Sequence, residues 1–529
     1  MMRTDNIPVW KDYGYAPRKS KAPGETLETL IVGGGPIGLA LALDLGRKGR
    51  DVVVINALPF IARGSKAICF SKRSLEIYDR LGVGGRLLKK GVVWEKGKVF
   101  WKGGAEPIYE FDLLPIKDQK FPAFINIQQY YVEEYLIDEI ARYPNIDIRW
   151  RHEAVAVTPR GDGVLVEIET PDERYWIETR YLLACDGAKS PVRTMLGLDF
   201  EGRVFEDNFL IADVKFRDER PTERWFHFDP PWPGASSLVH KQPDGVWRLD
   251  FQLGWNIDKK EAVKPQNVDP FVRGLLGPDV EFEYEWLSVY TFQCRRLARF
   301  VHDRVIFAGD AAHLVSPFGA RGCNGGMQDV DNLAWKLDRV LNGASPPALL
   351  ESYNSEAITV ADVNIMHSTR STDFMTPKSG MASIFRDAVL ELARAHDFAR
   401  PFVNSGRLSQ AAPYANSPLS TPDADGFAAG PEPGAPLIDA PLGDGWLLEK
   451  FGETFKILAF GGGAAPEIAG IDVVAVPAGA AVARGRYGAE DGAAYLVRPD
   501  QHVAARWKRP NAEAVNAALA RAQGLEIRR

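Results

Sequence analysis

The amino-acid sequence predicts an α/β protein that combines a parallel β-sheet with an antiparallel sheet and a smaller C-terminal α/β unit. Three observations predict this class. Largely apolar runs of the parallel-strand type occur at 27–32, 51–55 and 304–308, each next to a glycine-rich turn or a helical pattern. Residues 247–253 alternate apolar and polar side chains instead. Short strand-like runs return after residue 454.

Length and composition limit the classes of function. At roughly 100–200 residues per domain, 529 residues correspond to about three domains. The chain is 45% hydrophobic and 25% charged with a net charge of −6, as in ordinary globular proteins. No long basic run points to nucleic acid, and no apolar run approaches the ~18 residues of a membrane span. Residues 1–21 lack a signal-type apolar stretch, which predicts a cytoplasmic protein.

Several kinds of site have no support in the sequence. The chain contains neither an HExxH nor a GxSxG motif, so a zincin-type metal site and a hydrolase elbow are not predicted. The cysteines are far apart and form no CxxC pair, which excludes a disulfide scaffold and a thiolate metal cluster. These four residues are Cys69, Cys185, Cys294 and Cys323. We interpret them as buried small apolar side chains.

The first strong element is a βαβ unit. A strand at 27–32 leads into Gly33-Gly34-Gly35-Pro36-Ile37-Gly38, and a helix pattern with leucines at 39, 41, 43 and 45 follows before the strand at 51–55. Gly33 permits the tight turn, Gly35 lets a pyrophosphate approach the backbone, and Gly38 lets the helix pack close to the strand. The N-terminus of the helix attracts phosphates. This context predicts a Rossmann-like dinucleotide-binding turn.

One position departs from the dinucleotide pattern. Asn56 stands where an acidic residue usually ends the second strand and binds the ribose hydroxyls, 21 positions after Gly35. Asparagine can bond a hydroxyl, although without the strength of a charged acceptor. No cation occurs between Asn56 and Arg63, so a 2′-phosphate has no partner there. We therefore expect an ADP moiety without a 2′-phosphate.

Two more motifs lie further along the chain. The first, at 181–193, contains Asp186-Gly187 followed by Arg193. The second begins with the strand at 304–308 and Gly309-Asp310, continues through a loop at 317–326, and ends in a helix pattern. We predict that His313, which lies between Gly309-Asp310 and this loop, is a packed residue rather than a catalytic one.

In this order and spacing, the three segments resemble the FAD-dependent aromatic hydroxylases, the class A flavoprotein monooxygenases related to p-hydroxybenzoate hydroxylase. The sequence looks most like the branch of 3-(3-hydroxyphenyl)propionate hydroxylase and phenol hydroxylase, which carries a thioredoxin-like C-terminal domain. The resemblance covers residues 27–370 well and 430–525 weakly.

The resemblance implies where FAD binds. Gln129 would contact the ribityl chain, Val155 the adenine, and Asp310 a ribityl hydroxyl. Lys66 stands where the family usually has arginine, so it keeps the charge but loses the bidentate fork. The complete set implied for the cofactor is Gly33, Gly35, Pro36, Ile37, Gly38, Asn56, Ser65, Lys66, Ala67, Gln129, Val155, Asp186, Gly187, Arg193, Gly309, Asp310, Pro317, Gly322, Cys323 and Asn324.

The loop at 317–324 is expected to approach the flavin ring. We predict that Asn324 is the N-cap of the following helix. A helix N-terminus directed at the N1–C2=O edge would stabilise the reduced, anionic flavin by about 0.3–2 kcal/mol.

The implied reaction is hydroxylation of a phenolic aromatic compound by NADH or NADPH and dioxygen, through a flavin C4a-hydroperoxide. Trp247, Leu249, Phe251 and Leu253 face one side of their strand and the polar residues the other. That polar face is either solvated or lines the substrate pocket. The candidates for catalysis are Pro317, Arg248, Asp250, Gln252, His240 and Tyr290, and His227 is a further candidate.

The predicted organisation follows from these assignments: an N-terminal arm at 1–26, an FAD-binding domain at 27–199 and 288–400, an antiparallel substrate domain at 200–287, a linker at 401–445 and a thioredoxin-like domain at 446–529. In the last domain, strands are expected at 455–460, 471–476, 494–497 and 503–507, with a helix at 511–522. This domain has no cysteine, so we assign it packing or dimer contacts.

Two alternatives remain open at this point. The same scaffold can carry other flavin chemistry, such as epoxidation, halogenation or dehydrogenation, although the halogenase motif Trp-x-Trp-x-Ile-Pro is absent. A non-catalytic FAD-fold binding protein is the other alternative. The sequence does not choose between substrates or between NADH and NADPH, and a homodimer is favoured only by resemblance.

Overall fold

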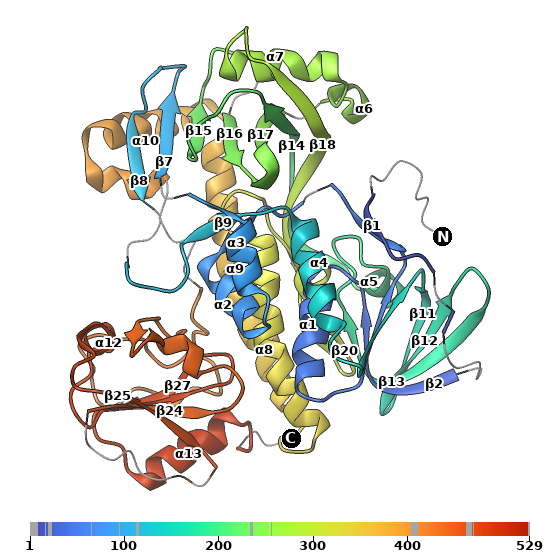
Figure 1. Ribbon diagram of the computed structural model, residues 1–529, viewed down its shortest axis with the longest axis vertical. Coiled ribbons are helices and arrows are strands. Elements are labelled where there is room, and N and C mark those ends of the chain that lie inside the picture. Colours follow the sequence, from blue (N-terminus) through green and yellow to red (C-terminus); the bar gives the residue numbers. More distant parts are fainter. Residues whose placement is uncertain are drawn as a thin grey trace.

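A computed structural model of the chain describes residues 9–15, 17–18, 24–64, 66–94, 96–112, 116–232, 236–254, 256–403, 411–461, 468 and 470–526, with the side chains of 205–207 left out. Figure 1 shows a central helical region beside a parallel sheet, a second sheet above it, and a separate C-terminal unit. Within the described residues, no helix is both long and apolar enough to span a bilayer.

The first sheet contains the predicted βαβ unit. Its strands follow the order β10-β3-β2-β13-β12-β11, and β20 pairs with β13 and with β19. Strands β10, β3, β2, β13 and β20 are mutually parallel where they pair, whereas β11, β12 and β13 form an antiparallel meander. The bounds are β2 Gly24–Val32, β3 Val52–Asn56, β10 Ile146–Trp150, β11 Glu153–Arg160, β12 Gly163–Glu169, β13 Arg174–Ala184, β19 Val301–His302 and β20 Val305–Phe307.

Helix α1, Pro36–Arg47, is buried along nearly its whole surface because it packs against β3, α4 and α8. This position explains its run of leucine and alanine on every side. Figure 1 shows α1, α4 and the long α8 next to one another in the centre of the molecule. The bounds of the helices in this region are α2 Lys72–Arg80, α3 Gly84–Lys90, α4 Gln129–Ile140, α5 Pro191–Met195, α8 Gly322–Leu341, α9 Leu349–Met375, α10 Gly380–Ala395 and α11 Arg400–Val403.

The second sheet has eight strands in the order β21-β18-β14-β17-β16-β15-β7-β8. All neighbours are antiparallel except β15 and β7. The bounds are β7 Lys96–Trp101, β8 Tyr109–Asp112, β14 Phe200–Phe216, β15 Arg224–Phe228, β16 Ser236–Lys241, β17 Val246–Gly254, β18 Phe282–Leu297 and β21 His313–Leu314. Strands from 96–112 therefore extend the sheet that the sequence placed at 200–287, because the edge of β15 is completed by parallel pairing with β7.

The two faces of this second sheet differ. One face, which we call the outer face, buries Leu210, Trp247 and Leu249 against Val268 and Val272 of helix α7, Pro265–Leu276. The inner face lies towards the rest of the molecule and carries the polar residues of β17. The predicted alternation of residues 247–253 is thus present, with the apolar members under α7. A short helix α6, Lys259–Ala262, precedes α7.

Short paired strands form two further small sheets. β1 Val9–Asp12 pairs with β4 Phe60–Ala62, and β9 Phe124–Asn126 pairs with both β5 Cys69–Ser71 and β6 Val92–Val93. Strand β5 leads directly into α2 and so brings residues 69–71 close to the start of α8.

The C-terminal unit contains the four strands and the final helix that the sequence predicts. The strand order is β25-β24-β26-β27, with β24 and β25 parallel and the other pairs antiparallel. The bounds are β22 Pro441–Leu442, β23 Gly445–Trp446, β24 Lys456–Phe460, β25 Asp472–Val476, α12 Ala481–Tyr487, β26 Ala494–Val497, β27 Val503–Trp507 and α13 Ala512–Ala522. The thioredoxin-like classification of this unit stays a prediction.

A buried ionic network joins this unit to the central helices. Arg498, just after β26, donates both terminal nitrogens to Glu356 of α9, at 2.6 and 2.9 Å. Lys336 of α8 reaches the same carboxylate at 2.6 Å. Arg73 of α2 bonds to Asp331 at 2.8 Å and to the carbonyl of Asp500 at 2.7 Å. The C-terminal unit is therefore fixed to α2, α8 and α9 by charged groups with almost no access to water.

Candidate functional site

The glycine-rich turn lies between β2 and α1 and has one open position. Gly33 has φ +113°, and a Cβ there would lie 2.3 Å from the carbonyl oxygen of Cys185. A Cβ at Gly38 would lie 2.0 Å from the carbonyl oxygen of Gly33. Around Gly35, by contrast, nothing lies within 4 Å of that position among the described residues. The turn is therefore tight at its ends and accessible in the middle, where α1 begins.

Asn56 supports this turn from the end of β3. Its Oδ1 accepts the Gly34 N–H at 3.0 Å, and its Nδ2 donates to the Leu58 carbonyl at 2.9 Å. The sequence predicted a ribose contact here, and the structure adds a structural role that aspartate could not fill in full, because a carboxylate cannot donate to Leu58. Val155 lies on β11, three residues after His152, whose N–H donates to the Asn56 carbonyl at 3.0 Å.

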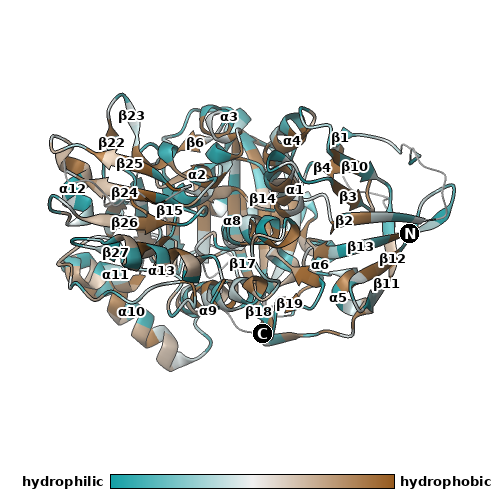
Figure 2. Ribbon diagram, turned by 90° about the horizontal axis from the view of Figure 1, so that it is seen from below, coloured by the Kyte–Doolittle hydropathy of each residue, from teal (hydrophilic) through white to brown (hydrophobic). Residues whose placement is uncertain are grey.

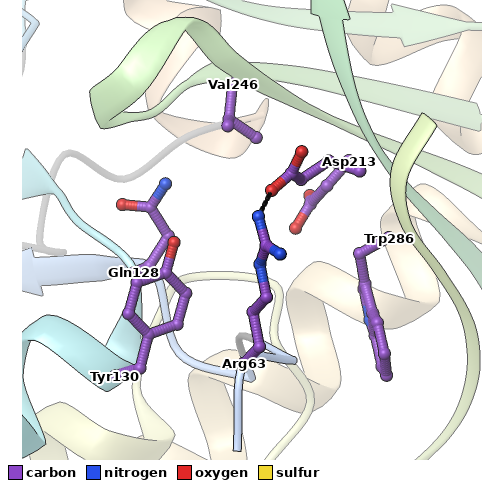
Figure 3. A pocket seen from close by; sticks show the side chains of 7 residues that line it. Arg63, Gln128, Tyr130, Asp213, Val246 and Trp286 are labelled. Atoms are coloured by element: carbon purple, nitrogen blue, oxygen red, sulfur yellow. Dashed lines mark hydrogen bonds and ion pairs between the residues drawn. The ribbon is translucent and has the colours of Figure 1, made fainter. Parts of the chain in front are cut away.

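Arg63, the first cation after Asn56, points towards the second sheet and not towards the glycine-rich turn. It forms an ion pair with Glu285 of β18. Figure 3 shows its side chain rising between Tyr130 and Trp286 in a small hollow that Gln128, Asp213 and Val246 also line. The guanidinium therefore links the loop after β4 to the second sheet.

The Asp-Gly and Gly-Asp motifs lie side by side, because β13 and β20 are paired in register from Leu182–Val305 to Ala184–Phe307. Asp186 accepts the Val192 N–H at 3.0 Å with one oxygen, while the other is buried without a partner in the described residues. Burial raises the pKa of Asp186. Arg193 donates to the carbonyls of Ala188 and Ala311, at 2.9 and 3.3 Å, and so connects the two motifs.

Asp310 presents an available carboxylate. Its side chain is exposed, and no hydrogen-bond partner for it is found in the described part of the chain. Its pKa is nevertheless raised by desolvation, so this carboxylate lies in a recess of the protein rather than on an outer surface. The preceding Gly309 donates its N–H to Asp329 at 2.8 Å.

His313 holds the same aspartate. Its Nε2 lies 2.7 Å from Asp329 Oδ2, and the ring is 2% exposed. Asp329 raises the pKa of His313 against the opposing effect of burial. His313 is therefore a packed residue that fixes the Gly309–Asp310 turn, in agreement with the sequence interpretation.

The start of α8 differs from the prediction in one respect. The helix begins at Gly322 after Arg321, so Asn324 lies inside its first turn and is not the N-cap. Instead, Asn324 Oδ1 accepts the N–H of Ser71 at 2.9 Å, and its Nδ2 donates to the carbonyl of Cys69 at 2.9 Å. Strand β5 presents a donor and an acceptor that match one amide side chain, and this pairing outweighs the capping preference.

The backbone N–H groups at the start of α8 remain without intrahelical partners, as at any helix N-terminus. Gly322 and Cys323 supply the first of them, directly after the loop that begins at Pro317. A Cβ at Gly322 would be 3.9 Å from an Asp310 carboxylate oxygen, so this helix start and Asp310 border the same space.

The segment after β4 closes another side of this space. Of the predicted residues here, Ser65 lies outside the described residues. The Ala67 N–H donates to Gln129 Oε1 at 3.1 Å, and Gln129 Nε2 donates to Glu133 at 2.8 Å. Lys66 is exposed, and its charge lowers the pKa values of both Glu133 and Asp310, which places it near both. Burial is the larger effect on Glu133 and raises its pKa to about 7.

On the inner face of the second sheet, polar and charged residues form a continuous line that we call the polar row. It consists of Arg224, His240, Arg248 and Asp213, which are register partners across β15, β16, β17 and β14. Arg248 binds Asp213 through Nε and Nη2, both at 2.8 Å. Because these residues are less than a tenth exposed, the polar side of β17 is an interior surface and not a solvated one.

The remaining candidates lie on the same inner face. Asp250 is 3.3 Å from Nε2 of His240, and Gln252 and Tyr290 follow along β17 and β18. Burial and the nearby Arg224 lower the pKa of His240 to about 4, so the imidazole is neutral at pH 7. The sheet thus brings together Arg248, Asp250, Gln252, His240 and Tyr290. His227, in contrast, stacks on Phe100 at 4.6 Å and lies outside this group.

Next to the polar row, the inner face becomes aromatic. Phe209 stacks with Phe292 at 4.8 Å and meets the edge of Phe318 at 4.8 Å. Phe318 belongs to the loop that runs from exposed Pro317 to α8. Through Phe318, the loop that leads into α8 therefore contacts the inner face of the second sheet. This face has one charged end and one aromatic end, and it lies beside the region of the glycine-rich turn and the two aspartate motifs.

The profile of a family described as "FAD binding domain" matches residues 26–368, which is more than half of the chain. The chain belongs to this FAD-binding family. Its α/β architecture with sheets of mixed orientation is that of the family.

Two curated relatives of this FAD-binding chain carry the same name, 3-(3-hydroxy-phenyl)propionate/3-hydroxycinnamic acid hydroxylase. The protein of Comamonas testosteroni is 29% identical over 381 residues, covering 71% of this chain and 63% of its own length. The protein of Escherichia coli O81 (strain ED1a) is 28% identical over 385 residues, covering 70% of this chain and 67% of its own length. The chain thus spans about two thirds of these relatives.

Solved structures share the fold. The flavin-dependent monooxygenase PieE, in complex with FAD and substrate, superposes with a TM-score of 0.78 at 22% identity, over 95% of this chain and 100% of PieE. The p-nitrophenol 4-monooxygenase PnpA from Pseudomonas putida DLL-E4 has a TM-score of 0.65 at 25% identity, over 73% of this chain and 99% of PnpA.

Sequence reasoning missed three residues of this region. Asp213 is the single charge in the apolar run 209–214 of β14, and this interruption was the available signal. Glu133 follows Gln129 by one helical turn, which indicates contact but not burial. Arg224 has no local signal, because its place in the polar row depends on the pairing of β15 with β16.

Proposed function

We propose that this chain is an FAD-dependent monooxygenase that hydroxylates a phenolic aromatic compound with NADH or NADPH and dioxygen. The observation that carries the proposal is the convergence of three backbone segments and the start of α8 beside a buried inner face that is partly aromatic and partly charged. The names of the two curated relatives and of the PnpA structure support the same reaction class.

The residues present fit FAD. The open side of Gly35 and the N-terminus of α1 suit the pyrophosphate. Asp310, with no partner in the described chain, suits a ribityl hydroxyl. The Asp186 oxygen that has no hydrogen-bond partner among the described residues suits a ligand hydroxyl or water. The amide of Gln129, held by Ala67, completes the proposed set.

Within this proposal, bound FAD supplies the oxygen-transfer chemistry, and the protein supplies position and charge. The N-terminus of α8 would stabilise negative charge on a bound flavin by about 0.3–2 kcal/mol. The phenylalanines on the inner face and Phe318 exclude water from the ring of the substrate. Asp250, oriented by His240 at 3.3 Å, accepts the proton of the phenol.

The test uses the purified yellow protein and a set of phenols and phenolic acids. A substrate is expected to stimulate oxidation of NADH or NADPH and to yield a product heavier by one oxygen atom. Stimulated oxidation with uptake of oxygen but no such product from any phenol contradicts hydroxylation. A phenol that is oxidised without oxygen uptake indicates a dehydrogenase instead.

A homodimer is also part of the proposal. Met381, Ile384, Phe385, Phe398 and Phe402 of the α10–α11 region are 64–75% exposed, and α10 lies at the periphery of the molecule (Figure 2). Side chains of this size expose roughly 600 Å² of apolar surface, which approaches the ~800 Å² that each partner contributes to a standard interface. Light scattering is expected to give twice the chain mass, and Met381→Ser with Phe385→Ser is expected to give monomers.

The cellular location of the protein is the last part of the proposal. All four cysteines are unpaired in the structure. Free thiols agree with a reducing compartment, and we include the cytoplasm in the proposal on this ground.

A further inference from the structure

The first described residues of the chain form a segment that we call the strap, residues 9–15 and 17–18. The region matched by the family profile begins at residue 26, so the strap lies outside it. Its first part is β1, which pairs antiparallel with β4. Tyr13 continues this attachment by donating its N–H to the carbonyl of Pro59 at 2.8 Å. The strap is therefore bound to the segment that follows β3.

The beginning of the strap packs on α4. Trp10 stacks on Tyr130 with ring centroids 4.4 Å apart, and its Nε1–H donates to Glu134 at 3.0 Å. Lys11 binds the same carboxylate at 3.1 Å. Figure 1 shows β1 beside α4. Because Tyr130 directly follows Gln129, this end of the strap is attached next to the expected ribityl contact.

The middle of the strap crosses the carboxyl ends of two parallel strands. Tyr13 stacks on Trp150, the last residue of β10, with ring centroids 4.6 Å apart. Trp150 is the register partner of Asn56, the last residue of β3. Tyr15 then meets the ring of His152 at 5.7 Å, next to the bond from His152 to the Asn56 carbonyl. Since nucleotides bind outside the carboxyl ends of such strands, the strap crosses the adenosine end of the proposed FAD site.

The far end of the strap is held by a buried arginine. Arg18 is 7% exposed and donates Nε and Nη2 to the two carboxylate oxygens of Glu173, at 2.9 and 3.2 Å. Its guanidinium also lies over the ring of Tyr175 at 4.1 Å, and the Tyr175 hydroxyl is 2.9 Å from Nδ1 of His152. A bidentate pair fixes orientation as well as position. The strap is therefore attached at both ends and in the middle.

The strap buries little surface besides these contacts. Val9, Asp12, Gly14 and Pro17 are exposed, so every second or third residue faces solvent. Short segments with few buried apolar contacts open at a small fraction of the global free energy of unfolding. Each attachment described above joins the strap to a protein group. The frequency with which the strap detaches is therefore set by these few contacts.

We propose that the strap is a gate over the adenosine end of the FAD site: the cofactor enters and leaves while the strap is detached and is enclosed while it is attached. Because its attachments are to protein groups, the strap closes equally over the empty and the filled site. A weaker attachment then speeds FAD uptake and FAD release by the same factor and leaves Kd unchanged. This inference rests on the FAD site of the proposed function and adds a rule for cofactor exchange.

The first experiment weakens the far attachment with Arg18→Met, which removes the bidentate pair with Glu173. The rate of FAD release from the loaded protein and the rate of FAD uptake by the cofactor-free protein are both expected to rise about 10-fold, with Kd within about 3-fold. FAD fluorescence follows both rates. Arg174→Met is the matched control, because Arg174 forms an exposed pair with Glu169 next to Glu173, and neither rate is expected to change.

The second experiment locks the strap and also serves if Arg18→Met gives no folded protein. Val9 and Ala62 are register partners of β1 and β4. Antiparallel partners have Cα atoms about 4.5–5.5 Å apart, which a disulfide can span. In the oxidised double variant Val9→Cys with Ala62→Cys, both rates are expected to fall about 10-fold or more, and reduction with a phosphine is expected to restore them. Mass spectrometry verifies the bond.

Three results would overturn the gate. Arg18→Met and Arg174→Met exchanging FAD at the same rate is the first. Faster release with unchanged uptake in Arg18→Met is the second, because the strap then holds FAD by direct contact. An oxidised double variant that exchanges FAD as fast as its reduced form is the third. None of these measurements needs turnover, so a failure to hydroxylate any phenol leaves the gate standing, and unchanged exchange rates leave the hydroxylase proposal standing.

Discussion

Substitution of Glu356 by glutamine tests whether the buried ionic network holds the C-terminal unit in place. Glu356 is 1% exposed and accepts bonds from Arg498, from Lys336 and, at 2.8 Å, from Asn332. The two cations lower its pKa from 4.5 to about 2. At 1.36 kcal/mol per pKa unit, this shift corresponds to about 3 kcal/mol of folding free energy.

The sign of the pH dependence follows from the lowered pKa. The stabilisation is fully present above pH 4.5, the ordinary pKa of the carboxyl, and is lost as the pH falls towards 2. At pH 7, Glu356→Gln is therefore expected to lower the free energy of unfolding by about 3 kcal/mol, because it leaves Arg498 and Lys336 buried beside a neutral amide.

Urea denaturation followed by tryptophan fluorescence measures this loss, since Trp335 lies in α8 next to Lys336. Glu351→Gln is the control. Glu351 is on the same helix but forms an exposed pair with Arg299, so a change of less than about 1 kcal/mol is expected. If Glu356→Gln costs no more than Glu351→Gln, the network does not hold the domains together and the reasoning fails.

Three further predictions concern the cofactor region. Asp310→Ala is expected to purify largely without yellow colour, whereas Asp303→Ala, at an exposed site, keeps it; the absorbance ratio at 450 and 280 nm measures this, and a fully loaded Asp310→Ala protein would contradict the assignment. Glu133→Gln is expected to raise the free energy of unfolding of the cofactor-free protein by up to about 3 kcal/mol at pH 8 but not at pH 4, because burial raises the pKa of Glu133 to about 7 and so penalises the ionised carboxylate. Denaturation at a series of pH values measures this, and the same difference in free energy between the two proteins at every pH would refute it. Asn324→Ala is expected to lower the melting temperature and to weaken FAD binding together, since it frees β5 from α8; calorimetry and FAD titration test it, and Asn342→Ala at the far end of α8 is the control.

The elements that the sequence predicted well are those specified by local patterns. The turn at Gly33–Gly38, the strands around it and the four C-terminal strands depend on residue periodicity and glycine placement, which act over a few positions. The alternation of β17 likewise predicted which residues share a face.

The parts that were missed depend on pairing between distant segments. Whether the polar side of β17 faces water or protein is decided by Asp213, which lies 35 positions before Arg248 in the sequence. The addition of β7 and β8 to the second sheet depends on parallel pairing with β15. Asparagine favours helix N-caps, so the sequence alone predicts that role for Asn324. Its hydrogen bond with Ser71 of β5 places it inside the first turn instead, and this contact between distant segments is not visible in the sequence.

Strands β14 and β18 run as continuous ribbons past both halves of the site. One stretch of β18 carries Tyr290, and its last residues, Arg295 and Arg296, pair with Leu314 and His313 just ahead of the loop at 317–324. Between these points the pairing of β18 with β14 shifts at a β-bulge, because Asn208 is opposite Thr291 whereas Val204 is opposite Gln293. The extra residues of β14 weaken the ladder there and increase its local twist, so the strand pair can bend between Tyr290 and the loop at 317–324. A ring that displaces Tyr290 can therefore move one end of β18 without moving the loop by the same amount.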